Sequence, residues 1–164
     1  MKRLVVTAVL GILAAASFAR GADDPFAQGV RTTEPLAPRD QEKTFKLPPG
    51  FEITLVAADP DIAKPMNLAF DAKGRLWVSS TSLYPWPAKS PEGKRDTIKV
   101  IELGDDGRAT KVTTFADGLD IPIGLLPLGD GARVLAYDIS SVRLHADTDG
   151  DGKSDGREPL YSGF

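Results

Sequence analysis

Two stretches of the chain repeat the same order of apolar and polar residues. PMNLAFDAKGRLWVSS (65–80) contains an apolar run, a polar turn with Gly74, and a second apolar run. IPIGLLPLGDGARVLAYD (121–138) has the same order around its turn at 129–131. A proline, Pro65 or Pro122, stands before each first run. Apolar runs of this length around a glycine-containing turn are typical of paired antiparallel strands. Each stretch therefore predicts a β-hairpin.

A second pair of similar segments follows the two predicted hairpins. GRATKVTTFADGL (107–119) aligns without gaps with GKSDGREPLYSGF (152–164). The segments TIKVIEL (97–103) and SVRLHA (141–146) come before them and read as further strands. Each repeat of roughly fifty residues thus contains four short antiparallel strands, which is the unit of a β-propeller.

This repetition favours a β-propeller over a β-sandwich, the main alternative, because a sandwich gives no reason for the strand order to recur. Propellers close with about four to eight such units, called blades. We therefore expect an all-β fold in which residues 48–164 form about two four-stranded antiparallel blades of an incomplete β-propeller. The chain would then be the N-terminal part of a longer protein.

The residues before the first hairpin carry two weaker signals. Segment 22–47 is polar and contains three prolines, which predicts a linker or extended lead-in with at most one helical turn near 39–43. Segment 51–57 alternates apolar and polar residues with one lapse, which predicts a strand.

The first 21 residues have the features of a signal peptide. A basic start, Met1-Lys2-Arg3, precedes about fifteen apolar or small residues, and small residues at Ser17 and Ala19 offer a cleavage site. An uncleaved anchor is the alternative. In either case we expect an exported protein that is periplasmic or associated with the cell envelope.

Composition narrows the possible partners and cofactors. Hydrophobic residues make up 41% and charged residues 26%, as in globular domains. The net charge is −3 and no basic stripe is visible, which argues against nucleic acid as a partner. The chain has no cysteine, which excludes disulfides, thiolate metal sites and covalent CxxCH haem within it.

The most specific motif is the acidic stretch DTDGDGKSDGRE (147–158). Its spacing fits D-x-[DN]-x-[DN]-G-x5-E, the pattern of a calcium loop. Lys153 would contribute its backbone carbonyl and the other ligands their carboxylates. A solvated acidic turn is the alternative. The predicted metal ligands are Asp147, Asp149, Asp151, Lys153, Asp155 and Glu158.

The flanking residues place this loop between strands. SVRLHA alternates like a strand, and Glu158-Pro159 does not continue a helix, which argues against an EF-hand. In a four-stranded meander the third connection shares one end of the sheet with the first, whereas the long second connection (79–97) lies at the other end. Functional residues concentrate in long loops, and the acidic loop lies at the other end of the sheet from the long loop. The calcium ion is therefore expected to be structural.

Several segments resemble a known family: the lead-in and first hairpin from GVRTTEP to YPWPA, RDTIKV, KVTTFADGLDIPIGLLPL, and DTDGDGKSDGREPLYSGF. They are similar to the start of exported propellers of planctomycete-type bacteria that are labelled membrane-bound dehydrogenases. The resemblance covers about residues 29–164. It implies a six-bladed propeller related to soluble pyrroloquinoline-quinone (PQQ) sugar dehydrogenases, often fused to haem-binding modules. The family's second calcium loop is reduced here to LGDDGRAT (103–110).

Other candidate residues have a functional and a structural interpretation each. Tyr84 and Trp86 offer a stacking surface for a sugar or planar cofactor, but packing that closes one end of the sheet is favoured. Lys64 and Asn67 begin a strand near the expected central channel, where a ligand contact competes with a strand-start hydrogen bond. His145 has no evident carboxylate partner for catalysis and is expected to be a strand residue.

Two classes of function therefore remain open. The resemblance implies an exported sugar or alcohol dehydrogenase of the quinoprotein type, with PQQ held by the complete propeller. The alternative is a non-catalytic, calcium-stabilised propeller that binds carbohydrate or protein. The expected partners are a small molecule or carbohydrate, the remainder of the propeller and a haem-binding module. The sequence assigns no catalytic or PQQ-binding residue.

Overall fold

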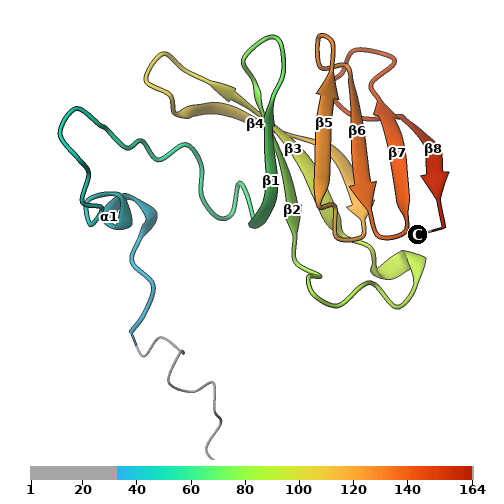
Figure 1. Ribbon diagram of the computed structural model, residues 1–164, viewed down its shortest axis with the longest axis horizontal. Coiled ribbons are helices and arrows are strands. Elements are labelled where there is room, and N and C mark those ends of the chain that lie inside the picture. The colour runs from blue at the N-terminus through green and yellow to red at the C-terminus, as the bar shows by residue number, and fades with distance from the viewer. Residues whose placement is uncertain (1–32, 164) are drawn as a thin grey trace, which may run out of the picture. The chain divides into compact units, whose positions relative to one another are not determined.

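A computed structural model describes residues 33–163 of the chain, and the predicted signal peptide lies outside this range. The all-β fold class is confirmed: two four-stranded antiparallel sheets account for nearly all regular structure (Figure 1). The first sheet consists of β1 (Lys64–Phe70), β2 (Leu76–Thr81), β3 (Asp96–Leu103) and β4 (Ala109–Leu119). The second sheet consists of β5 (Gly124–Leu128), β6 (Arg133–Asp138), β7 (Ser141–Ala146) and β8 (Gly156–Ser162).

Within each sheet the strands follow one another in chain order, each pairing with the next. Apolar and β-branched residues predominate in β2 and β3, and such residues favour a pleated, packed surface. The strands predicted at 97–103 and 141–146 are present, the second with the same bounds. Among residues 33–163, the regular elements outside the sheets are helix α1 (Pro38–Glu42) and the 3-10 turn η2 (Pro91–Gly93).

The largest apolar core lies between the two sheets. Trp77 of β2 is fully buried and meets Phe115 of β4 edge to face, with ring centroids 4.7 Å apart. The second sheet contributes Val134 and Ala136 of β6 to the same cluster. Aromatic and aliphatic burial of this kind contributes roughly 1.5–3 kcal/mol for each fully buried side chain. The sheets are thus joined by a shared core, with β1 next to β5.

Residues 56–62, which precede β1, cover part of the other face of the first sheet, over β2 and β3. Val56, Ala57 and Ile62 pack against Leu76, Val78 and Ile101. The strand expected at 51–57 is not formed, and this prediction was wrong. The segment joins the first sheet through one backbone hydrogen bond, from the Ala109 amide to the Val56 carbonyl. Its alternation therefore reflects one-sided packing on the sheet without strand pairing.

A buried carboxylate ties the β1–β2 turn to the second sheet. Asp71 accepts hydrogen bonds from the Lys73 and Arg75 amides at 2.9 and 3.0 Å and from the Trp77 indole at 2.9 Å. Its other contact is an ion pair with Arg75 at 2.7 Å. The same guanidinium donates to the carbonyls of Asp130 and Gly131 in the β5–β6 turn, each at 3.1 Å.

Gly131 is required at this junction for two reasons. Its φ of 76° lies in the left-handed region, which a residue with a Cβ rarely adopts. A Cβ there would also overlap the side chains of Arg75 and Asp71. The close approach of the two turns therefore depends on the absence of a side chain.

The two ends of the sheets carry different connections. The β1–β2 and β5–β6 turns meet at one end of the sheets and line a hollow there. The acidic β7–β8 loop borders this hollow too. The long β2–β3 loop lies at the opposite end (Figure 1). This is the division of loops that the order of strands predicts.

Replacing Asp71 with Asn is expected to destabilise the fold by about 2 kcal/mol at pH 7, because it removes a buried, hydrogen-bonded charge. Burial raises the pKa of Asp71, but hydrogen bonds from Trp77, Arg75 and Lys73 outweigh this effect and leave the pKa lowered. A carboxyl with a lowered folded-state pKa stabilises the fold above its unfolded pKa, and this stabilisation is lost as the pH falls through the folded pKa.

Urea unfolding at several pH values measures this effect. The stability difference between wild type and Asp71→Asn should be full at pH 7 and shrink below about pH 4. Asp105→Asn, which changes an exposed acid in the β3–β4 loop, should show little difference at any pH. If the difference in unfolding free energy between wild type and Asp71→Asn stays constant down to pH 2, the charge of Asp71 is not its cause.

Candidate metal centre

The acidic loop joins β7 to β8, and two backbone hydrogen bonds hold its base. The Asp155 amide donates to the Ala146 carbonyl at 3.0 Å and closes the loop, and the Asp147 amide donates to the Ala132 carbonyl at 2.9 Å and ties the loop to the β5–β6 turn. The loop therefore leaves one strand and enters the next without a helix on either side.

Three of the predicted ligands come together in this loop. One carboxylate oxygen from each of Asp147, Asp149 and Asp151 lies within 4.8 Å of the others. Each carboxylate also accepts at least one backbone amide of the loop, including Gly150 and Gly152 on Asp147 at 2.7 and 2.9 Å. These bonds fold the loop so that the three side chains face a common point.

The remaining predicted ligands are placed differently. Asp155 accepts hydrogen bonds from the Thr148 hydroxyl at 2.7 Å and the Thr148 amide at 3.0 Å, which lower the pKa of Asp155. Lys153 lies in the loop, where its amide donates to Asp151. Glu158 lies in β8 opposite Leu144 and is exposed. In the described part of the chain, the close carboxylate group comprises the three aspartates alone.

The chemistry of this group fits a hard cation. All its donor atoms are oxygens, which suit calcium or magnesium, whereas zinc sites in proteins draw mainly on histidine and cysteine. Three carboxylates held this close repel one another, and a bound cation would relieve that repulsion.

The acidic loop also contacts the first sheet. The Ser154 amide donates to the Phe115 carbonyl of β4 at 2.6 Å. Arg157 donates to the Asp117 carbonyl and lies 3.5 Å from the Asp117 carboxylate. A hollow of about 330 Å³ at this end is lined by residues of both sheets. Its charged members are Lys73, Arg75, Glu102, Lys111, Asp130, Asp147 and Asp151. The loop therefore belongs to the junction of the sheets as well as to its own strands.

His145 is buried in β7, two residues before the first aspartate. Burial lowers the pKa of His145 to about 4, helped by Arg157 and Arg143 and opposed by Asp138. The imidazole is therefore neutral at pH 7. Its Nδ1 has no hydrogen-bond partner among the described residues. The structure places His145 in the interior of a strand, as the sequence predicts.

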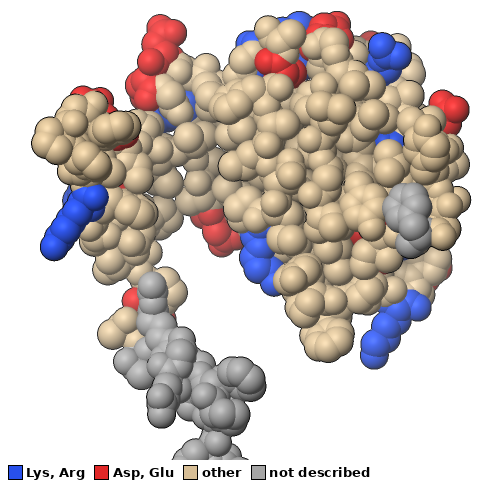
Figure 2. All heavy atoms as spheres, in the orientation of Figure 1, with Lys and Arg blue, Asp and Glu red and all other residues tan. Residues whose placement is uncertain are grey.

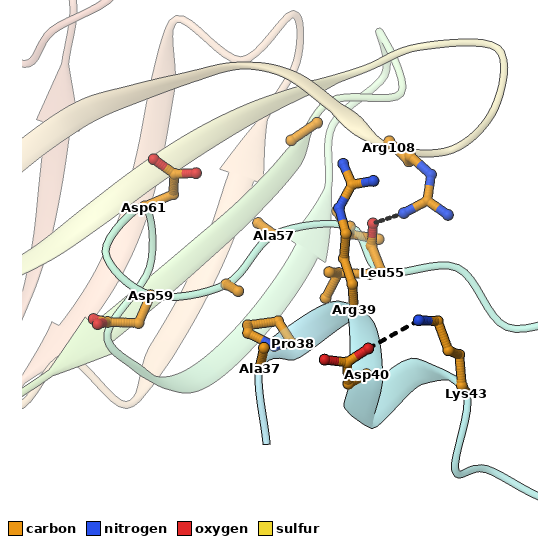
Figure 3. Close-up of a pocket in the computed structure, with 13 residues that line it drawn as sticks. Ala37, Pro38, Arg39, Asp40, Lys43, Leu55, Ala57, Asp59, Asp61 and Arg108 are labelled. Atoms are coloured by element: carbon orange, nitrogen blue, oxygen red, sulfur yellow. Dashed lines mark hydrogen bonds and ion pairs between the residues drawn. The ribbon is translucent and has the colours of Figure 1, made fainter. Parts of the chain in front are cut away.

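The lead-in borders a larger hollow of about 680 Å³, between α1, residues 55–61 and the start of β4 (Figure 3). Three of its charged side chains are paired: Arg108 lies 3.2 Å from Glu42, and Lys43 lies 2.8 Å from Asp40. A hydrogen bond from the Leu55 amide is the main cause of a lowered pKa at Glu42. The pair of Arg108 with Glu42 anchors helix α1 to the residue that precedes β4.

At the opposite end, the expectation that Tyr84 and Trp86 pack against the sheet was wrong. Their exposed fractions are 53% and 78%. Lys64, at the start of β1, donates to the Tyr84 carbonyl at 3.4 Å, and Asn67 is half-buried in the same strand. Neither the order of apolar and polar residues in this loop nor its composition predicts that the two rings face solvent.

Within the described range, no helix is both long and apolar enough to cross a membrane. Comparison with curated proteins and with solved structures gives no match. Residues 37–164 match the model of a protein family described as a domain of unknown function, DUF7133. This match spans most of the chain, which therefore belongs to the DUF7133 family.

Proposed function

We propose that the chain forms two successive blades of a β-propeller and that a structural calcium ion bound by the acidic loop fixes them. The adjacency of β1 and β5 supports the propeller, because the first strands of neighbouring blades lie side by side around a propeller's axis. The apolar core that the two sheets share also supports the propeller.

The free face of the second sheet supports this arrangement further. In the first sheet, the row of paired residues Ala69, Trp77 and Val100 faces the second sheet. The corresponding row in the second sheet is Leu126, Leu135 and Leu144. Leu126 is 56% exposed, and Tyr161 on β8 is 67% exposed. An apolar sheet face of this kind is suited to packing against a further blade.

The observation that carries the calcium proposal is the convergence of Asp147, Asp149 and Asp151 within a loop folded by their own backbone hydrogen bonds. Calcium takes about six to eight oxygen ligands. Asp155, Glu158 and the carbonyl of Lys153 are the residues in position along the chain to complete such a set, by shifts of the loop and of the start of β8. When bound, the ion would supply positive charge that offsets the repulsion of the aspartates.

Stabilisation of the sheet junction follows from the loop's contacts. Ser154 and Arg157 lie in the same loop and its following strand, and both bind β4 of the first sheet. Ordering the loop would therefore order the contact between the blades. This is a structural role, and it uses no catalytic group.

Export is part of the proposal through the predicted signal peptide at residues 1–21. PQQ, sugar or alcohol dehydrogenase activity and a haem-binding partner are part of it only through the family resemblance. They concern a complete propeller. The carboxylates and histidine described above serve the fold or the acidic loop, and none of them is assigned to a redox reaction.

Isothermal titration of calcium into the full chain tests the metal site. Wild type should bind about one calcium ion, and Asp147→Ala should lose most of the affinity, because the first ligand of such a loop binds the ion directly. Asp105→Ala, in the equivalent β3–β4 loop, is the matched control and should bind as wild type does. Magnesium should substitute poorly, because it prefers a tighter shell and keeps its waters.

Thermal unfolding gives the second measurement. Calcium at a hundred times its Kd should stabilise wild type by about 2.7 kcal/mol, and the resulting rise in Tm should largely disappear in Asp147→Ala. If wild type binds no calcium up to several millimolar, about the weakest affinity of extracellular calcium modules, the loop is a solvated acidic turn.

A further inference from the structure

The long loop at 82–95, which joins β2 to β3, is held in place by two buried carboxylates. Asp96 is 2% exposed and accepts hydrogen bonds from the Thr81 hydroxyl and from the amides of Ser82 and Ile121 at 2.7 and 3.0 Å. Asp120 is 4% exposed and accepts from the Ala88 amide at 3.0 Å. Burying a carboxylate is costly unless it is hydrogen-bonded, so these contacts fix the loop at its start and in its middle.

The turn that carries the first ring is also fixed. The Thr81 hydroxyl oxygen accepts the amides of Leu83 and Tyr84 at 3.0 and 3.1 Å, and the Trp86 amide donates to the Leu83 carbonyl at 2.8 Å. The backbone beneath Tyr84 and Trp86 is therefore well ordered while both rings remain largely exposed. Aromatic side chains on a fixed backbone have only two side-chain torsions to order on binding, which makes them effective contact groups.

Basic residues outnumber exposed acids in and next to this loop. Lys64, Lys89, Lys94 and Arg95 lie in or next to the loop, whereas its exposed acid is Glu92, because Asp96 is buried. Lys94 lies 4.0 Å from the Asp120 carboxylate, and Arg95 donates to the Ser82 hydroxyl at 3.0 Å. The chain as a whole has a net charge of −3, so this surface is locally basic on an acidic protein. Figure 2 shows Lys and Arg side chains on the surface at the end where the loop lies.

We propose that the loop surface formed by Tyr84, Trp86, Lys89 and Arg95 binds an acidic polysaccharide. The apolar faces of sugar rings would stack on the two aromatic rings, and the carboxylate or sulfate groups would pair with Lys89 and Arg95. The rings stand on an exposed surface, which suits a polymer that gains affinity from repeated contacts rather than a small molecule that must be enclosed. This proposal does not depend on calcium in the acidic loop at the other end.

Nucleic acid offers the same combination of rings and negative charge. It is the less favoured ligand because its affinity rests mainly on many phosphate contacts, and the chain has a net negative charge and no basic stripe.

Affinity electrophoresis of the full chain tests the proposal in calcium-free buffer, so that calcium does not bridge protein and polymer. The matrices are polygalacturonate, its highly methyl-esterified form, dextran sulfate, neutral dextran and a poly(dT) oligonucleotide. Polygalacturonate or dextran sulfate should retard the protein, and comparing the two distinguishes carboxylate from sulfate recognition. The esterified polymer keeps the sugar rings and removes the charge, and it should retard the protein at least tenfold less.

Variants identify the surface. Tyr84→Ala combined with Trp86→Ala should weaken retardation at least tenfold, and Lys89→Glu about threefold or more. Phe51→Ala and Lys46→Glu remove an exposed ring and an exposed lysine from the residues before β1 and should change the retardation less than twofold. Circular dichroism should show the same fold for all four proteins.

Three results would overturn the proposal. The first is no retardation by either acidic polymer. The second is retardation that the Tyr84 and Trp86 substitutions leave unchanged. The third is equal or stronger binding to poly(dT), which would identify a surface for single-stranded nucleic acid.

Discussion

The arrangement of the two sheets depends on the buried carboxylate of Asp71. It receives hydrogen bonds from its own turn and from the indole of Trp77, the central residue of the core. It also orients Arg75, which reaches the carbonyls of the neighbouring turn. One charged group thus determines the shape of a turn, the position of the core tryptophan and the approach of the second sheet. The apolar core supplies most of the attraction between the sheets, but apolar contact is non-directional, and the directional contacts of Asp71 select one arrangement.

A second carboxylate pattern recurs at the opposite end of both sheets. In the first sheet the hydroxyl of Thr81, at the end of β2, binds Asp96 at the start of β3. In the second sheet Asp138, at the end of β6, accepts the hydroxyl of Ser141 at the start of β7. The carboxylate follows the connection in the first sheet and precedes it in the second. In both sheets, however, the pair closes the connection between the second and the third strand. In the first sheet this pair supports a long loop, whereas in the second it closes a short turn.

Much of this fold can be predicted from the sequence, because strand formation in both sheets follows local apolar runs and turn residues. The repeat between 107–119 and 152–164 corresponds to β4 and β8, and Phe115 and Leu160 both lie where the strand pairing is irregular. The turns of the two predicted hairpins differ in length by one residue. The last pair of the first hairpin, Phe70 with Leu76, encloses five residues, whereas the last pair of the second, Leu128 with Arg133, encloses four. Ungapped alignment does not show which face a residue occupies after such a change in length.

The candidate site was only partly predictable for a similar reason. Spacing located the aspartates at 147, 149 and 151, because close neighbours in a tight loop necessarily converge. The positions of Asp155 and Glu158 depend on a competing hydrogen bond from Thr148 and on where β8 begins. Segment 51–57 shows the converse: its alternation predicts a half-buried extended chain, but the backbone partner that would make it a strand is not encoded nearby. The position of the loop that carries Trp86 depends on the buried acids Asp96 and Asp120, which accept the amides of Ser82 and Ala88, and their burial is not evident from the loop's own residues.

The position of β2 has a consequence for the dynamics of the molecule. This strand has a neighbour on each side, the second sheet over one face and residues 56–62 over the other, and all six of its residues are buried. Its amides should therefore exchange with solvent deuterium only when the whole unit opens. The amides of β8, whose residues are mostly exposed, should exchange through local fraying. The free energies of the openings that allow amide exchange in these two sheets would thus range from that of global unfolding to that of local fraying.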